Sequence, residues 1–145
     1  MAKILVIHGP NLNLLGEREP AIYGEQTLDD INKMLKDTAA KHQVEVDCFQ
    51  SNHEGAIVDQ IQAARDQYEA VIINAGAYTH YSIAILDALR SFKGPVIEVH
   101  LSNIYQRESY RHRSLVSEAA TGGIFGLGAL SYKLALLGII EMLNL

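Results

Sequence analysis

The stretch KILVIHGPNLNLLGEREPAIYGEQTL, which runs from Lys3 to Leu28, decides the fold of this chain. It begins with an apolar run of strand length and ends where an amphipathic helical pattern opens at Thr27. The loop between them, Gly9–Gln26, is much longer than the about 2–6 residues that usually join a strand to a helix in α/β units. It contains an arginine, a tyrosine and several leucines, and Gly16 and Gly24 are placed as hinges. The pattern indicates a packed loop that moves, as an active-site lid does.

Apolar runs of strand length alternate with helical patterns along the rest of the chain. The expected strands are Lys3–His8, Val44–Gln50, Ala70–Asn74, Val96–Leu101 and Ile124–Ala129. The expected helices are Leu28–His42, Ala56–Tyr68, Ser82–Ser91 and Tyr132–Leu143, with a shorter one near Arg107–Arg113. This alternation predicts a flavodoxin-like α/β fold, with a five-stranded parallel sheet in the order 2-1-3-4-5 and helices on both faces. Residues 1–145 are expected to form a single catalytic domain.

Composition argues against several classes of function. The formal net charge of −5 argues against a nucleic-acid partner. The longest uncharged run, Ala119–Tyr132, is broken by glycines and is shorter than the roughly 20 residues of a membrane-spanning helix, so no membrane segment is expected. The single cysteine, Cys48, cannot form an intrachain disulfide and fits a reducing cytoplasm. One basic cluster is either a solvated patch or a pocket for an anionic small molecule: Arg107, Arg111, His112 and Arg113.

Polar residues follow four of the expected strands at the point where each strand ends. They are His8-Gly9-Pro10-Asn11, Gln50-Ser51-Asn52-His53, Asn74-Ala75-Gly76 and His100-Leu101-Ser102-Asn103. In open α/β sheets, ligands bind at the edge where the carboxyl ends of the strands meet. These four groups of residues are therefore expected to form the site.

The fourth strand carries residues suited to general acid catalysis. Side chains alternate along a strand, so Glu98, His100 and Ser102 share one face. A carboxylate that accepts a hydrogen bond from one imidazole nitrogen fixes the tautomer, favours the imidazolium and leaves the other nitrogen as a proton donor. An unpaired buried carboxylate is costly, so Glu98 and His100 are expected to pair. The alternative is a pair that only holds the strand in place.

Arg18 and Tyr23, five residues apart in the lid loop, offer a general base. A guanidinium held within about 4–6 Å of a phenol favours its phenolate form. A tyrosine on a loop more often only packs, but beside a histidine acid it completes the pair of opposite roles that an elimination requires.

Other chemistries lack their motifs in this sequence. Neither G-x-G-x-x-G nor G-x-x-x-x-G-K-[ST] occurs, which disfavours dinucleotide and nucleoside-triphosphate binding. No histidines are spaced as metal ligands, and no G-x-S-x-G elbow exists. A metal site and a serine-hydrolase site are therefore not expected.

Four blocks of the sequence resemble the type II 3-dehydroquinate dehydratases. They are His8–Pro20 followed by Tyr23-Gly24, Asn74–Gly76 with Tyr78-Thr79-His80, Glu98–Asn103, and Arg107-Glu108 with Arg111 and Ser114. The stretch Thr121–Gly128 is similar to the family's last strand, so the resemblance spans essentially the whole chain. It implies the dehydration of 3-dehydroquinate to 3-dehydroshikimate by anti elimination through an enolate, with no metal, flavin or Schiff-base lysine. This reaction serves the shikimate pathway of aromatic amino acid biosynthesis or the breakdown of quinate.

The resemblance also assigns roles to residues. Tyr23 is implied to be the base that takes the proton from C2, activated by Arg18. His100 is implied to protonate the departing C1 hydroxyl, oriented by Glu98, while Asn11 places the water that stabilises the enolate oxygen. The implied substrate-binding residues are Asn74, His80, Asp87, Leu101, Ser102 and Arg111.

Some choices are not made by the residues themselves. Local patterns give no reason to prefer Asn74 over Gln50 as a binding group. Tyr81 and Ala77 depart from the family pattern beside His80, so the volume of the pocket and the recognition of substrate hydroxyls are left open.

The resemblance implies a homo-oligomer, a dodecamer built from trimers, in which Asp87 reaches into a neighbouring subunit's site. The helix Ser82–Ser91 carries more apolar residues than one buried stripe needs, which favours an interface; a well-buried helix of a monomer is the alternative. Two other functions stay open at this point. They are another cofactor-free lyase or isomerase of small hydroxy-acids, and a non-enzymatic flavodoxin-like binding module.

Overall fold

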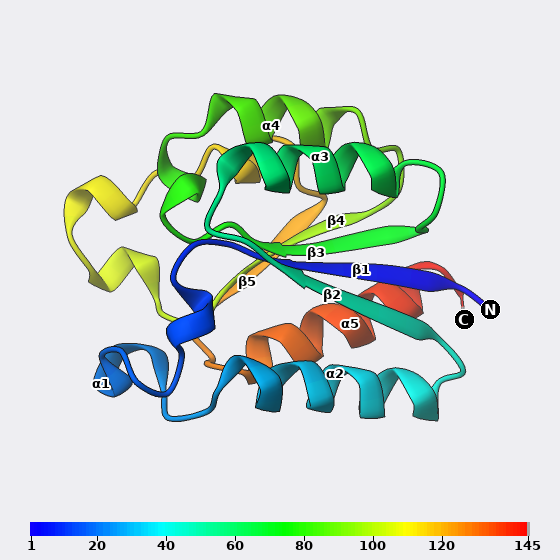
Figure 1. Cartoon of the computed structure of the whole chain (residues 1–145), viewed down its shortest axis with the longest axis horizontal. Helices are drawn as coiled ribbons and strands as arrows, with labels where there is room; N and C mark the ends of the chain where they lie inside the picture. The colour runs from blue at the N-terminus through cyan, green and yellow to red at the C-terminus, as the bar shows by residue number, and fades with distance from the viewer. Residues whose placement is uncertain (145) are drawn as a thin grey trace.

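The structure, a computed structural model, describes residues 1–144 and is built around a five-stranded sheet (Figure 1). The strands are β1 (Lys3–His8), β2 (Glu45–Gln50), β3 (Ala70–Asn74), β4 (Val96–His100) and β5 (Gly122–Phe125). Their order is β2-β1-β3-β4-β5, and every neighbouring pair is parallel. The predicted flavodoxin-like fold and strand order are therefore confirmed.

Helices cover both faces of the sheet (Figure 1). The helices α2 (Leu28–Lys41) and α5 (Leu130–Met142) lie on one face, and α3 (Glu54–Ala64) and α4 (Ile83–Arg90) lie on the other. The alternation of side chains along β1 explains this layering, because Ile4 and Val6 join the core cluster of α2 and α5, whereas Leu5 and Ile7 join that of α3 and α4. The apolar runs of the strands thus supply two cores, one on each side.

The long loop after β1 contains local structure of its own. It holds the 3-10 turn η1 (Leu12–Leu14) and the short helix α1 (Pro20–Tyr23), where sequence patterns indicated only a loop. The loop ends at a capping box, in which the backbone N–H of Thr27 donates to Asp30 Oδ2 at 3.0 Å and that of Asp30 donates to Thr27 Oγ1 at 3.1 Å. No residue of α1 is buried, so this part of the loop packs lightly on the rest of the molecule and its movement stays a prediction.

Three predicted elements differ clearly from the structure, and the others differ from it by at most two residues at either end. The last strand was expected at Ile124–Ala129 but is Gly122–Phe125, because two glycines pair with β4 without contributing side chains to an apolar pattern. The short helix expected near Arg107–Arg113 is instead two 3-10 turns, η3 (Ile104–Gln106) and η4 (Ser109–Arg111). Helix α3 begins two residues earlier and ends four residues earlier than the expected Ala56–Tyr68.

Two further 3-10 turns complete the elements: η2 (Gly76–His80) follows β3 at the carboxyl edge of the sheet, and η5 (Val116–Glu118) packs in the core cluster of α4. Among residues 1–144, no helix has the length and apolar character needed to cross a membrane.

Candidate active site

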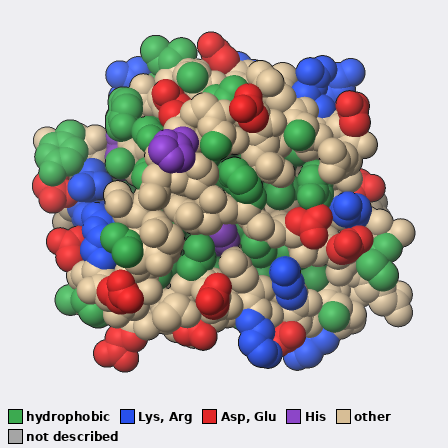
Figure 2. Space-filling view, in the orientation of Figure 1, with side chains coloured by type: hydrophobic (Ala, Val, Ile, Leu, Met, Phe, Trp, Pro, Cys, Tyr) green, Lys and Arg blue, Asp and Glu red, His purple; other side chains and the backbone are tan. Residues whose placement is uncertain are grey.

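A cavity of about 230 Å³ lies at the carboxyl edge of the sheet, where four strands were expected to form a site. Positively charged side chains gather at this edge, on the left of the space-filling view (Figure 2). Nine of the eleven site residues expected from the sequence line the cavity: Asn11, Arg18, Tyr23, Asn74, His80, His100, Leu101, Ser102 and Arg111. Of the other two, Glu98 lies behind His100 and Asp87 lies on α4, outside the cavity lining.

Glu98 and His100 form a buried pair at the end of β4. His100 Nε2 lies 2.5 Å from Glu98 Oε2, and both side chains are almost inaccessible to solvent. The carboxylate also accepts hydrogen bonds from the hydroxyls of Ser114 and Ser117. Burial by itself raises the pKa of Glu98, but the bonds from His100, Ser114 and Ser117 outweigh it and hold the pKa below its usual value. Glu98 is therefore a carboxylate that accepts the Nε2 proton of His100, which leaves Nδ1 as the free nitrogen.

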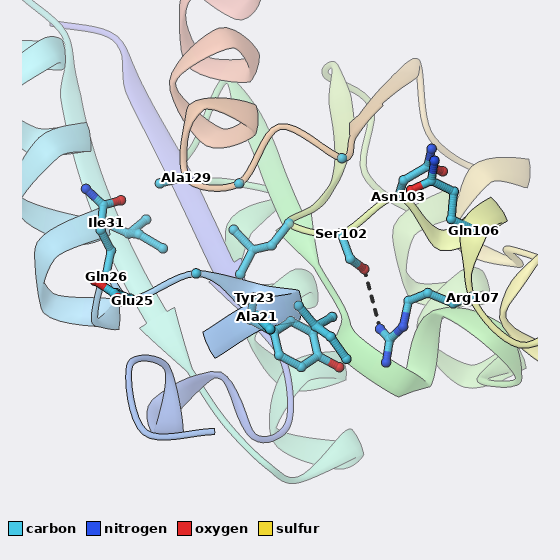
Figure 3. A pocket seen from close by; sticks show the side chains of 15 residues that line it. Ala21, Tyr23, Glu25, Gln26, Ile31, Ser102, Asn103, Gln106, Arg107 and Ala129 are labelled. Carbon is cyan, nitrogen blue, oxygen red and sulfur yellow. Dashed lines mark hydrogen bonds between the residues drawn. The ribbon is translucent and has the colours of Figure 1, made fainter. Parts of the chain in front are cut away.

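Tyr23 lies close to two guanidinium groups. The Cζ atom of Arg18 is 4.8 Å from the centre of the phenol ring, and that of Arg107 is 5.2 Å from it. Arg107 also donates to Ser102 Oγ at 3.4 Å, and Figure 3 shows it beside Tyr23. The spacing of Arg18 and Tyr23 in the sequence predicted the first contact, but nothing in the sequence predicted the second. In the sequence, Arg107 belonged to the basic cluster and to one of the blocks that resemble the family, but no role was assigned to it.

The basic cluster is divided by the structure. Arg107 and Arg111 line the cavity, so this half of the cluster faces a pocket. The other half does not line it: Arg113 contributes its backbone oxygen to a hydrogen bond with His80, and His112 bonds the backbone oxygen of Arg107 at 2.9 Å. The basic cluster is therefore part of a pocket at Arg107 and Arg111, and a solvated surface patch at His112 and Arg113.

His80 is held as a hydrogen-bonded imidazole at the rim. Its Nδ1 donates to the backbone oxygen of Arg113 at 2.8 Å. Partial burial lowers the pKa of His80 from its usual value, against the opposing effect of that hydrogen bond. Asn74 is nearly fully buried at the end of β3, where its Oδ1 accepts the backbone N–H of Gly76 at 3.1 Å. Of the two amides that the sequence left open, Asn74 lines the cavity and Gln50 does not.

His8, expected at the site edge, is buried beneath it. Its ring lies between α2 and α5, with Nε2 at 2.8 Å from Asn32 Oδ1 and Nδ1 at 3.0 Å from the Tyr132 hydroxyl. Burial lowers the pKa of His8 to about 4, so the imidazole is neutral at pH 7, and the amide oxygen of Asn32 can only accept. His8 therefore donates through Nε2 and accepts the Tyr132 proton at Nδ1. This histidine belongs to the core.

The two departures from the family pattern beside His80 lie at different places. Ala77 lines the cavity, whereas Tyr81 does not. Tyr81 is 62% exposed and packs edge-on against Tyr78, with ring centres 5.7 Å apart. The cavity volume is thus set in part by Ala77 and not by Tyr81.

A second cavity of about 440 Å³ opens on the other side of Tyr23 (Figure 3). It is lined by the lid around α1 and by the segments that follow β4 and β5. Tyr23, Leu101, Ser102 and Arg107 line both cavities. The lid tyrosine therefore stands in a wall between the two spaces.

Fold and site together define an α/β enzyme suited to acid–base chemistry, with a buried carboxylate–imidazole pair and a tyrosine close to two guanidinium groups. The sequence model described as Dehydroquinase class II matches residues 2–140. The chain is 58% identical over 141 residues to 3-dehydroquinate dehydratase of Gloeothece citriformis (strain PCC 7424), covering 97% of this chain and 93% of that protein. It is 53% identical to 3-dehydroquinate dehydratase of Bacillus mycoides (strain KBAB4), covering 99% of both.

Solved structures agree with this assignment. The type II dehydroquinase from Butyrivibrio crossotus DSM 2876 superposes with a TM-score of 0.93 at 47% identity, covering 99% of this chain and 98% of that chain. The chain therefore belongs to the class II dehydroquinase family and is an enzyme of the hydro-lyase type.

Proposed function

We propose that this chain dehydrates 3-dehydroquinate to 3-dehydroshikimate through an enolate, with Tyr23 as base and His100 as acid. The observation that carries the proposal is that these two side chains line one cavity, and each lies beside a group of opposite charge. Tyr23, which acts as an anion, lies beside Arg18, and His100, which acts as a cation, is bonded to Glu98. The names of the relatives support the substrate.

The base is Tyr23 as its phenolate. Arg18 and Arg107 both lie near its ring and stabilise the negative charge that the phenol acquires when it ionises. Arg107 has the stronger effect, because its side chain is only 14% exposed whereas that of Arg18 is 38% exposed, and charges interact more strongly away from water. The phenolate takes the proton from C2, and the electron pair passes into the neighbouring carbonyl to form the enolate.

The acid is the imidazolium of His100. The Glu98 carboxylate holds the Nε2 proton, so Nδ1 carries the proton that is transferred. This proton goes to the C1 hydroxyl, which leaves as water as the enolate collapses and the C1–C2 double bond forms. Ser114 and Ser117 keep Glu98 ionised and therefore act through His100.

The remaining cavity residues bind the substrate in this proposal. Asn74, with the Leu101–Ser102 backbone and the Ser102 hydroxyl, holds the carboxylate side of the ring. His80 and Arg111 bind ring hydroxyls, and Asn11 places a water beside the enolate oxygen. All of them line the cavity in which the proposed acid and base lie.

Assembly and context remain proposals as well. We propose that residues 1–145 are one catalytic domain that assembles as trimers within a dodecamer. Asp87 is exposed on α4, which is compatible with the expected reach into a neighbouring site. Light scattering that gives the mass of a single 16.0 kDa chain would refute the oligomer. The cytoplasmic location and the role in aromatic amino acid biosynthesis stay predictions.

The experiment mixes the purified protein with 3-dehydroquinate, without added metal or cofactor, and follows the absorbance of the conjugated product, with Tyr23→Phe and His100→Ala in parallel. We expect turnover by the unmodified chain, none by Tyr23→Phe, and a loss of about 10²–10⁴-fold in His100→Ala. Turnover by Tyr23→Phe would overturn the base, and a loss below about tenfold would reduce His100 to a structural role. No turnover by the folded chain would favour another cofactor-free lyase or isomerase of small hydroxy-acids.

A further inference from the structure

Asn11 enters the cavity from a backbone conformation that most residues avoid. Its φ and ψ angles are 69° and −5°, in the left-handed region, and it directly follows Pro10. Asparagine tolerates this region better than most residues, but the conformation persists only where neighbours hold it. Because Asn11 lines the cavity of Tyr23 and His100, whatever holds its backbone also sets where its amide points.

The hydrogen bond that holds this backbone comes from the end of the neighbouring strand, β2. The backbone N–H of Asn11 donates to Asn52 Oδ1 at 3.0 Å. Asn52 belongs to the polar group that follows the second strand, and it does not itself line the cavity. The function proposed above gives it no role.

Two contacts hold Asn52 in turn. Gln50 Nε2 donates to Asn52 Oδ1 at 3.2 Å, so the amide oxygen that accepts from Asn11 has its direction fixed by a second donor. The hydroxyl of Tyr78, in η2, donates to the backbone oxygen of Asn52 at 2.8 Å. The side chain and the main chain of Asn52 are thus tied to two different elements.

The segment before Asn11 is pinned to a third strand. The backbone N–H of Gly9 donates to the backbone oxygen of Asn74 at 2.7 Å. The backbone of Gly9 also lies so close to Ala75 that a Cβ at position 9 would be 2.4 Å from the backbone oxygen of Ala75. Between Gly9, fixed on β3, and the 3-10 turn, whose Leu14 N–H donates to the Asn11 oxygen at 3.0 Å, the bond to Asn52 is the side-chain contact that holds the Asn11 N–H.

We propose that Asn52 is a positioning residue for catalysis, which holds Asn11 in the left-handed conformation and so aims its amide into the site. The proposal rests on the function proposed above. Displacing a catalytic group by about 1 Å can reduce the rate by about 10²-fold, so loss of this bond is expected to lower kcat. The effect falls on kcat more than on KM, because the amide of Asn11 then fails to support the charge that develops in the transition state.

The test compares two substitutions of nearly equal size. Asn52→Leu removes the acceptor, whereas Asn52→Asp keeps an oxygen for both Asn11 and Gln50. The added charge of Asn52→Asp lies just before the first residue of α3, Glu54, where a helix N-terminus favours an anion. Asn13→Leu is the control for the loss of an amide in the same loop: it leaves the bond from the Asn11 N–H to Asn52 in place and removes only the long bond, 3.4 Å, that Gln50 Nε2 donates to Asn13 Oδ1. Each variant is assayed for kcat, KM and thermal unfolding.

We expect kcat to fall about 10-fold to 100-fold in Asn52→Leu, with KM changed less than about threefold, and to stay within about threefold of the unmodified enzyme in Asn52→Asp and Asn13→Leu. In the background of Asn11→Gly, which removes the amide, Asn52→Leu should cause no further loss, because residues that act through one another are not additive. A loss in Asn52→Asp as large as that expected for Asn52→Leu overturns the proposal, as does a further large loss in the double variant.

Failure of the proposed function gives a different result. No turnover by the unmodified chain overturns that function, and the role of Asn52 with it. Full turnover by Asn52→Leu beside an active unmodified chain overturns only the role of Asn52.

Discussion

Lowering the pH from about 6.5 to about 4 should destabilise this protein through one buried imidazole, that of His8. The ring is inaccessible to solvent, and both nitrogens are hydrogen-bonded in a way that suits the neutral form, to Asn32 and to Tyr132. Burial lowers the pKa of His8 from 6.5 to about 4 in the folded protein. The unfolded chain therefore binds a proton in this pH range that the folded chain does not bind.

The sign and size of the effect follow from that difference. Where the unfolded state binds more protons, the free energy of unfolding increases with pH, so the contribution of His8 is fully present above pH 6.5 and is lost as the pH falls toward 4. At 1.36 kcal/mol for each pH unit, the interval between 6.5 and about 4 corresponds to about 3 kcal/mol, most of it lost by pH 4.5. This is a large share of the about 5–15 kcal/mol that stabilises a typical domain.

The assay is urea-induced unfolding at a fixed protein concentration, from pH 4.5 to 7.5, of the unmodified chain and of His8→Gln. The amide of glutamine stays neutral throughout this range, so subtracting the two curves removes the titration of groups such as His80 and Glu98. We expect the stability advantage of the unmodified chain over His8→Gln to shrink by about 2–3 kcal/mol between pH 7.5 and pH 4.5. Parallel curves would refute the conclusion that His8 is buried and neutral.

Four further substitutions test the site and its support. Arg107→Ala should lower kcat by roughly 10-fold to 100-fold, and more than Arg18→Ala, because the negative charge of the base loses a nearby cation; an unchanged kcat in both variants would refute activation of the base by these cations. Glu98→Gln should lower kcat about 10²-fold, because the imidazolium of His100 loses its counter-charge; a kcat within about threefold of the unmodified enzyme would contradict this. Gly9→Ala should destabilise the fold by about 1–3 kcal/mol, measured by thermal unfolding, because its methyl group would lie 2.4 Å from a backbone oxygen; an unchanged melting temperature would argue against that close approach.

Sequence patterns were reliable where near neighbours along the chain determine the structure. The strands Lys3–His8 and Ala70–Asn74 were predicted at the bounds observed, because each is a continuous apolar run that is buried on both faces. The Glu98–His100 pair followed from the alternation of side chains in a single strand. The last strand was misplaced because its first two residues, Gly122 and Gly123, have no side chain from which a pattern can be read.

The burial of His8 was also within reach of the sequence, though it was not predicted. His8 continues the alternation of Ile4 and Val6 on one face of β1, and these residues pack toward α2 and α5. Its place at a strand end directed attention to the site edge. The alternation of side chains along β1, however, places the His8 ring in the core.

By itself, then, the sequence determined the order and type of the elements, the long lid with its arginine and tyrosine, and the histidine beside its carboxylate. All of these depend on residues a few positions apart, whose relative placement is set by the period of a strand or the length of a loop. Only the tertiary structure decided that Arg107 lies against Tyr23, that Ser117 supports Glu98, and that Asn52 holds Asn11. These contacts join residues that are far apart in the chain or on separate elements. They exist because packing two layers of helices on a twisted sheet brings the carboxyl ends of its strands to one edge.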